Sequence, residues 1–212
     1  MGKVIVELSR KGYTDLHAVE LPLTSLAEDA ERTKKMVLQQ KVPVVLVGHS
    51  YGGAVITEAG NQPNVVGLVY IAAFAPDAGE SLGGITQEHL PAAAANLAPD
   101  SDGFLWIKPD KFHESFCQDL TDDEGLVMAV TQKAPLASTF GNTISVPAWK
   151  NKPSWYQISS EDRMIAPENE RRMSARLGAK KIITLAASHA SLASKPIEVA
   201  ALIDEAAKES MK

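Results

Sequence analysis

A serine between glycines is the first residue of this chain whose setting could support chemistry. Ser50 lies in the sequence GHSYG, residues 48–52, directly after the branched apolar run 44–47. A serine hydroxyl becomes a useful nucleophile when a base removes its proton, and a sharp turn between a buried strand and a helix exposes such a serine. Neighbouring backbone comes close to such a turn, so we expect Gly48 and Gly52 to stand where a side chain would clash. The pentapeptide alone is a weak signal, and its place between a strand pattern and a helical pattern is what favours a nucleophile.

A base and an acid for this serine follow two later strand patterns. Asp162 comes just after the apolar run 154–159, and His189 comes just after the run 181–186. The carboxyl ends of parallel strands meet at one edge of a sheet, so both side chains should lie near Ser50. Serine, acid and histidine in this chain order are typical of a nucleophile, an orienting acid and a base. The pattern therefore favours Ser50 as nucleophile, His189 as base and Asp162 as the acid.

Other titratable residues are alternatives for the same roles. Asp77, after the run 65–73, is an alternative acid, because some enzymes of this architecture place the acid there. Glu161 is more typical of a solvated neighbour of Asp162. The remaining histidines fit the role of base less well, because they fall in a strand pattern, in the serine turn or in a long insertion; they are His17, His49, His89 and His113.

Strand patterns and helical patterns alternate along the chain. A capping box at Ser25 and Glu28 opens a helix to about residue 40, and further helical patterns cover 54–60 and 196–208. Pro167 stands at a helix start, and Gly178 follows as its stop. The alternation predicts an α/β fold, a mostly parallel sheet with helices on both faces. The strand patterns are residues 16–21, 42–47, 65–73, 154–159 and 181–186.

Residues 76–150 interrupt this alternation, and we call them the cap segment. They hold six prolines, several turn clusters and a second capping box at Thr121 and Glu124. A long irregular insertion is typical of a lid over a binding site, and a passive surface excursion is the alternative. We expect residues 1–212 to form a single domain, with the cap segment as an insertion. Bulky apolar residues in or near it could line a pocket or pack in a core; they are Phe74, Leu82, Phe104 and Trp106.

Composition excludes several classes of function. The net charge is −5 and the basic residues are scattered, which argues against a nucleic-acid partner. The single cysteine, Cys117, excludes an internal disulfide and is typical of a small buried residue in a reducing compartment. Neither a signal peptide nor a membrane-spanning run appears, so we expect a cytoplasmic protein without a membrane partner. The histidines and the cysteine never fall at metal-ligand spacing, and we expect neither metal nor cofactor.

Five stretches of the chain resemble the α/β-hydrolases. More narrowly, the chain is similar to a compact bacterial esterase-like branch related to plant methyl esterases and hydroxynitrile lyases. The resemblance implies a Ser50–Asp162–His189 triad, with the cap segment over the site. Hydroxynitrile lyases carry a lysine directly after the catalytic histidine, and here that position is Ala190. The stretches are residues 21–33, 44–60, 65–81, 147–173 and 187–196.

The start of the chain departs from this family. Members begin with a strand and a His-Gly loop, whereas residues 2–13 resemble the helix that follows them; KVIVEL alone could also form a strand. The loop normally gives one of two backbone donors to the oxyanion hole, and the other is the amide of Tyr51. We therefore expect an N-terminally shortened α/β-hydrolase, weakly active and poorly stable. Its sheet should either keep a gap or pair the runs 16–21 and 42–47 directly.

The leading functional interpretation is a serine hydrolase that cleaves a small carboxylic ester. Ser50 would attack the carbonyl, His189 would carry the proton, and Asp162 would hold the imidazole. A ligand-binding protein with impaired chemistry on the same scaffold is one alternative. A hydroxynitrile-lyase-like or carbon–carbon bond-cleaving enzyme is the other. The sequence does not indicate which acyl group is cleaved or how many copies of the chain associate.

Overall fold

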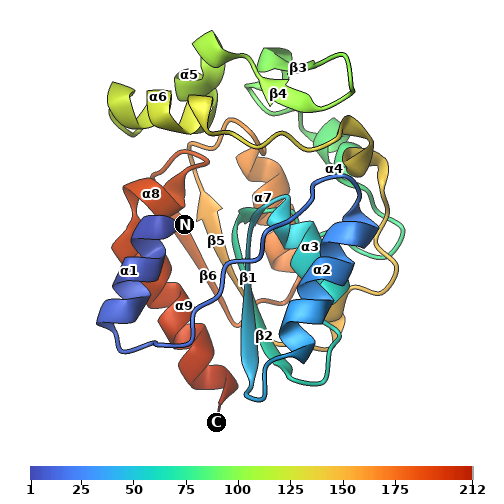
Figure 1. Ribbon diagram of the computed structural model, residues 1–212, viewed down its shortest axis with the longest axis vertical. Coiled ribbons are helices and arrows are strands. Elements are labelled where there is room, and N and C mark those ends of the chain that lie inside the picture. Colours follow the sequence, from blue (N-terminus) through green and yellow to red (C-terminus); the bar gives the residue numbers. More distant parts are fainter. Residues whose placement is uncertain (212) are drawn as a thin grey trace.

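A four-stranded parallel sheet forms the centre of the computed structural model, which describes residues 1–211 (Figure 1). The strands lie in the order β1-β2-β5-β6. The inner strands β2 and β5 are almost entirely buried, as apolar strands covered on both faces of a parallel sheet must be. Four of the five predicted strands are confirmed. Their bounds are β1 (Val44–Ser50), β2 (Val65–Ala73), β5 (Ser154–Ser159) and β6 (Lys181–Leu185).

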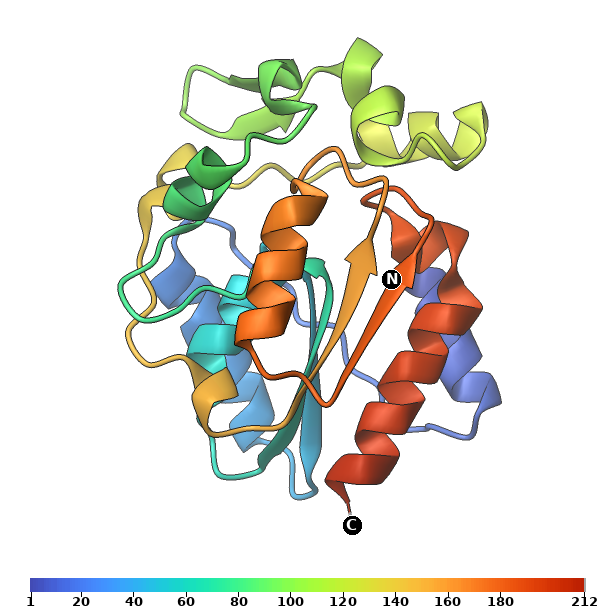
Figure 2. The ribbon, with the colours of Figure 1, turned by 180° about the vertical axis from the view of Figure 1, so that it is seen from behind.

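Helices cover both faces of this sheet, which confirms the predicted α/β architecture (Figure 2). Helices α2 (Leu26–Leu38), α3 (Gly52–Ala59) and α7 (Pro167–Arg176) share one apolar cluster with one face. Helices α1 (Gly2–Arg10), α8 (Ser191–Ser194) and α9 (Pro196–Ser210) lie on the other face and share the second cluster. Within residues 1–211 no helix combines the length and the apolar character that crossing a bilayer requires.

Helix ends follow the local signals in the sequence. The Ser25 side chain accepts the N–H of Glu28 at 3.2 Å at the start of α2, which confirms the predicted N-cap. Pro167 is the first residue of α7, and Gly178 follows that helix with φ +59°, a conformation that favours glycine. Residues 2–10 form the expected helix rather than a strand.

The prediction of a strand at residues 16–21 is wrong. This segment is irregular, and β1 pairs with β2 alone among the described residues. The adjoining backbone is already bound elsewhere: the N–H of Leu23 donates to Asp29 in α2, and its C=O accepts the N–H of Leu136 in the cap segment. Leu23 also has φ +65°, which an extended strand does not allow. The sheet therefore shows neither of the two expected arrangements, and β1 forms its edge.

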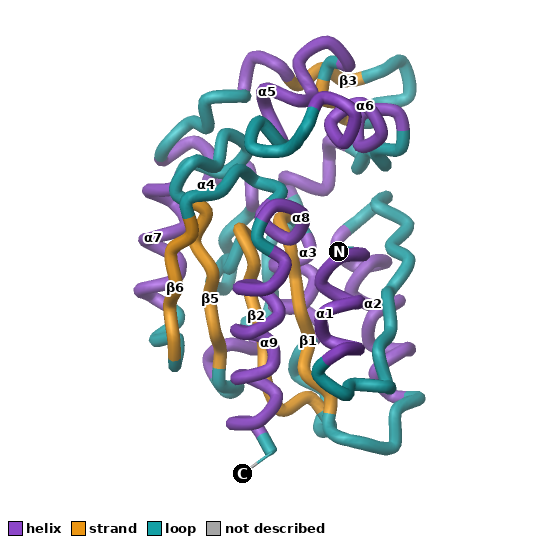
Figure 3. Tube along the Cα trace, turned by 90° about the vertical axis from the view of Figure 1, so that its left-hand side faces the viewer, coloured by secondary structure: helices purple, strands orange, loops and turns teal. Residues whose placement is uncertain are grey.

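Most of the cap segment, from α4 (Leu82–Glu88) to α6 (Asp122–Val130), lies beyond the carboxyl ends of the strands, and its last residues run back beside α3 to the start of β5 (Figure 3). Between α4 and α6 it contains a short hairpin of β3 (Leu97–Pro99) and β4 (Leu105–Ile107), followed by α5 (Phe112–Phe116). The predicted capping box at Thr121 and Glu124 opens α6. Four 3₁₀ turns join these elements: η1 (Ala94–Asn96), η2 (Pro109–Lys111), η3 (Ala137–Gly141) and η4 (Ala148–Lys150). Strands β1, β5 and β6 therefore all end beneath this segment.

Candidate active site

Ser50 occupies a strained turn between β1 and α3. It is the last residue of β1, and its φ of +55° lies in the left-handed region that residues with a side chain rarely adopt. The surrounding structure holds this conformation, because the C=O of Ser50 accepts the N–H of Phe74 at 3.1 Å and α3 begins two residues later. Such backbone strain persists only where neighbouring elements fix it. A turn of this kind exposes the serine at the end of the sheet.

Two glycines make room for this turn, and only one of them is among those expected. A Cβ on Gly48 would lie 2.5 Å from the backbone oxygen of Gly52, so the expectation for Gly48 is met. The expectation for Gly52 is wrong, because a Cβ there would meet open space. The second close approach is at Gly53, where a Cβ would lie 2.2 Å from the backbone oxygen of Phe74. The packing of α3 against the end of β2 therefore requires a glycine at position 53, one residue after the expected Gly52.

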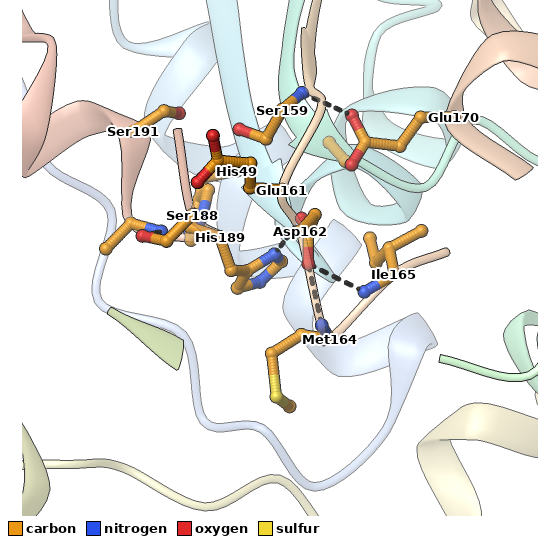
Figure 4. Close-up of polar contacts among 12 residues, drawn as sticks. His49, Ser159, Glu161, Asp162, Met164, Ile165, Glu170, Ser188, His189 and Ser191 are labelled. Carbon is orange, nitrogen blue, oxygen red and sulfur yellow. Dashed lines mark hydrogen bonds and ion pairs between the residues drawn. The ribbon is translucent and has the colours of Figure 1, made fainter. Parts of the chain in front are cut away.

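Asp162 and His189 form a buried pair at the ends of β5 and β6. The Nδ1 atom of His189 lies 2.5 Å from Oδ2 of Asp162, and both side chains are at most 1% exposed (Figure 4). The other oxygen, Oδ1, accepts the backbone N–H groups of Met164 at 2.7 Å and Ile165 at 2.9 Å. An ionised carboxylate accepts hydrogen bonds and cannot donate them, so Nδ1 of His189 carries the proton. Its Nε2 is then the nitrogen with a free lone pair, as a base requires.

His49 links this pair to the serine turn. Its Nε2 donates to the backbone C=O of His189 at 2.8 Å, and the two imidazole rings are 4.6 Å apart. Burial, with a smaller effect of the His189 charge, lowers the pKa of His49 to about 3, so the ring is neutral. Among residues 1–211 no hydrogen bond joins Ser50 Oγ to His189. Such a bond is often long without substrate and shortens when substrate binds.

The alternative acid lies apart from the histidine. Asp77 forms an ion pair with Lys150 at 2.5 Å, and this hydrogen bond lowers the pKa of its carboxyl. Glu161 is exposed. Its backbone N–H donates a hydrogen bond to the C=O of Ala187 at 3.1 Å. Asp162 is thus the candidate acid that contacts His189.

The cap segment contacts the loops that carry both residues of the pair. The ring of Phe116 at the end of α5 meets His189 edge-on, with ring centroids 4.9 Å apart. Gln118 donates to the backbone C=O of Glu161 at 2.7 Å, and Asp119 accepts the N–H of Ser188 at 3.0 Å. These contacts hold the segment over the pair. Sequence reasoning missed Phe116, and its place in an irregular segment offered no periodic signal that could have found it.

Three of the four bulky residues that the sequence offered as pocket lining have side-chain contacts away from the imidazole. Phe74 and Leu82 belong to the main apolar cluster, in keeping with the alternative of core packing. Trp106 is 37% exposed, and its indole N–H donates to Asp100 at 2.8 Å within the cap segment. Phe116 is therefore the large apolar side chain that the structure places against the imidazole.

Tyr51 carries the backbone donor that the sequence assigned to an oxyanion hole. Its amide directly precedes α3 and has no acceptor among residues 1–211. Its hydroxyl donates to Asp29 at 2.6 Å, which ties the start of α3 to α2. Burial is the main reason that the pKa of this hydroxyl is raised. The arrangement leaves the amide at a helix N-terminus, where negative charge is favoured.

Metal-binding side chains do not gather in the part of the chain that the structure describes. No group of three His, Cys, Asp or Glu residues there could hold a metal ion. Cys117 is buried, and burial raises the pKa of its thiol to about 11. A thiol with so high a pKa is a poor nucleophile and a poor metal ligand.

Comparison with known proteins assigns the chain to a family. A model of the alpha/beta hydrolase family matches residues 7–202. The chain belongs to the alpha/beta hydrolase family. It is therefore a hydrolase, and the predicted family and fold class are confirmed.

Three known proteins show how far the similarity of this hydrolase reaches. A probable hydrolase from a Phoma species is 29% identical over 169 residues, which make up 74% of this chain and 66% of that protein. A crystal structure of a pyrethroid hydrolase has a TM-score of 0.79 at 21% identity, over 100% of this chain and 93% of the other. A methylesterase from Arabidopsis has a TM-score of 0.76 at 16% identity, over 98% and 92%. Both structures share the fold.

The glycine geometry predicts opposite outcomes for two neighbouring substitutions in the hydrolase. Gly53→Ala should destabilise the protein by about 1–3 kcal/mol, because the new methyl group overlaps the backbone of Phe74. Gly52→Ala should be neutral or stabilising by up to about 1 kcal/mol, because the methyl group meets open space and alanine favours the helix. Urea denaturation of both variants measures the difference, and equal midpoints would contradict the close approach at Gly53.

The cap contacts predict which aromatic residue affects substrate selection. Phe116→Ala should change the ratio of kcat/KM between short and long acyl esters by about tenfold or more, because the ring borders His189. Trp106→Ala is the matched control, since that side chain is held at the surface by Asp100. Steady-state rates on a series of p-nitrophenyl esters give the ratios. An unchanged ratio in Phe116→Ala, or an equal change in Trp106→Ala, would count against this assignment.

Proposed function

We propose that this hydrolase cleaves small carboxylic esters through an acyl-enzyme formed on Ser50. The observation that carries the proposal is the buried Asp162–His189 hydrogen bond, which leaves Nε2 as the basic nitrogen of the histidine. The strained turn at Ser50 supplies a nucleophile at the same edge of the sheet. A positioned base and a held nucleophile are the two requirements of acyl transfer.

The proposed reaction has two halves that share these groups. Ser50 Oγ attacks the ester carbonyl carbon while its proton moves to Nε2 of His189, and the C–O bond to the alcohol then breaks as the alcohol takes that proton. Water attacks the acyl-enzyme in the second half, again giving its proton to Nε2. The carboxylic acid leaves and Ser50 regains its proton. Asp162 stabilises the imidazolium that forms in both halves.

The negative charge on the carbonyl oxygen also needs a donor. In this proposal the amide of Tyr51 donates to that oxygen, aided by the N-terminus of α3. Removing one such donor costs on the order of 10²–10³ in turnover in serine hydrolases. The free amide at this position is therefore suited to a developing oxyanion.

Two of the similar structures support an ester as the substrate class. One is a methylesterase and the other a pyrethroid hydrolase by name. This chain matches more than nine-tenths of the length of each of these proteins. We infer the reaction type from these names together with the site, and we leave the acyl group open.

Replacing the nucleophile tests the proposal. Ser50→Ala should lower kcat on p-nitrophenyl acetate by about 10⁴–10⁶, because it removes the hydroxyl on which the acyl-enzyme forms. Covalent labelling by a fluorophosphonate, followed by mass spectrometry, should modify the peptide that contains Ser50 and should fail in this variant and in His189→Ala. Ser160→Ala, a half-buried serine bonded to the C=O of Leu185, is the matched control and should label normally. Labelling that persists in Ser50→Ala would rule out Ser50 as the nucleophile.

A further inference from the structure

A second buried carboxyl group lies behind the Asp162–His189 pair. Glu170 on α7 is completely buried, and its Oε2 accepts the backbone N–H of Ser159 at 3.0 Å (Figure 4). Its other oxygen, Oε1, meets no N–H or O–H donor among residues 1–211. The proposed ester hydrolysis does not use this group. A fully buried carboxyl with one unsatisfied oxygen needs an explanation.

Asp162 is the neighbour that Glu170 faces. Side-chain hydrogen bonding with Asp162 is one of the causes that raise the pKa of Glu170, and two ionised carboxylates cannot form such a bond because neither has a proton to donate. Two neighbouring buried negative charges also repel each other strongly. One of the two groups must therefore hold a proton.

The hydrogen bonds decide which group holds it. Asp162 accepts three donors, from Met164, Ile165 and His189, and each of them favours the ionised form. Glu170 accepts only one, from Ser159. Three well-placed donors therefore keep Asp162 ionised and leave the proton to Glu170.

The charged and titratable groups around Glu170 lead to the same assignment. Burial is the largest cause that raises the pKa of Glu170 well above its usual range, and the negative charge of Asp162 is the next. Tyr156 on β5 faces it as a neutral phenol, since burial raises the pKa of that hydroxyl. The nearest cation on its own helix, Arg171, is exposed and pairs with Glu168 at 3.7 Å. No cation of residues 1–211 forms an ion pair with Glu170.

We propose that Glu170 is a neutral carboxylic acid whose O–H donates to Asp162, and that this hydrogen bond positions the carboxylate that orients His189. The inference rests on the proposed function, because it assigns Glu170 as a positioning residue for that reaction. The fourth donor fixes Asp162 without adding a negative charge beside the imidazole. The proton stays on Glu170 throughout the catalytic cycle.

A neutral isostere separates this role from simple packing. Glu170→Gln keeps the shape, its amide N–H can donate to Asp162, and its C=O can accept the N–H of Ser159. Glu170→Leu keeps most of the volume but supplies neither group. Glu168→Gln, at an exposed position on the same helix, is the matched control.

The protonation of Glu170 can be measured without any assay of activity. An acid that is neutral when folded and ionised when unfolded makes the native state hold the extra proton, so stability falls as pH rises above about 4.5. The unfolding constant of the wild type divided by that of Glu170→Gln should therefore increase by up to about tenfold for each pH unit between pH 5 and 8. Infrared spectra at pH 7 should show the carbonyl band of a protonated carboxyl in the wild type and in Glu168→Gln, and not in Glu170→Gln.

Turnover then tests the positioning role. Glu170→Leu should lower kcat by about 10–100-fold, the usual effect of removing a supporting hydrogen bond, and Glu170→Gln should recover most of that loss. A pH-independent ratio of unfolding constants or a missing infrared band would overturn the neutral acid. Equal losses of kcat in the two variants would overturn the positioning role. The unfolding and infrared results do not depend on ester hydrolysis, so a failure of the proposed function would be recognised separately.

Discussion

Burial of the Asp162 carboxylate is the constraint on which the rest of the site depends. A buried anion is costly unless charge-assisted hydrogen bonds replace its water. Here the turn after β5 supplies two backbone N–H groups and the loop after β6 supplies the imidazole of His189. The turn, the loop and α7 must therefore keep their mutual positions for the carboxylate to remain ionised. This requirement explains why Asp162, Glu170 and His189 are all almost completely buried.

The parallel sheet brings Ser50, the proposed nucleophile, to the same edge from a different strand. Ser50 ends β1, and the histidine before it is bonded to the backbone of His189. The cap segment closes the arrangement, because Phe116 packs on the imidazole and Asp119 holds the adjacent N–H of Ser188. The imidazole of His189 is thus surrounded by elements from four separate parts of the chain: the end of β1, the turn after β5, the loop after β6 and the cap segment. Fixed elements of this kind reduce the reorganisation that a reaction would require.

The strands and helix ends that could be predicted from the sequence are those with a local residue pattern. The four confirmed strands are apolar runs, and the helix ends at Ser25 and Pro167 carry their own signals. The strand expected at residues 16–21 did not form because the backbone beside it is bound to α2 and to the cap segment. The roles of Gly53 and Glu170 depend on which backbone or carboxyl group lies opposite them. Only the packed structure determines such neighbours, so neither residue carried a signal in the sequence.

The central claim is that the buried carboxylate of Asp162 fixes the proton of His189 on Nδ1. Nitrogen-15 NMR of the imidazole at neutral pH measures this directly in the protein labelled at histidine. We expect His189 to show a bonded proton on Nδ1 and none on Nε2, with Nδ1–H protected from exchange with water. In Asp162→Asn the preference should weaken or reverse. A proton on Nε2 of His189 in the unmodified protein would contradict the account, because that nitrogen could then not accept the proton of Ser50.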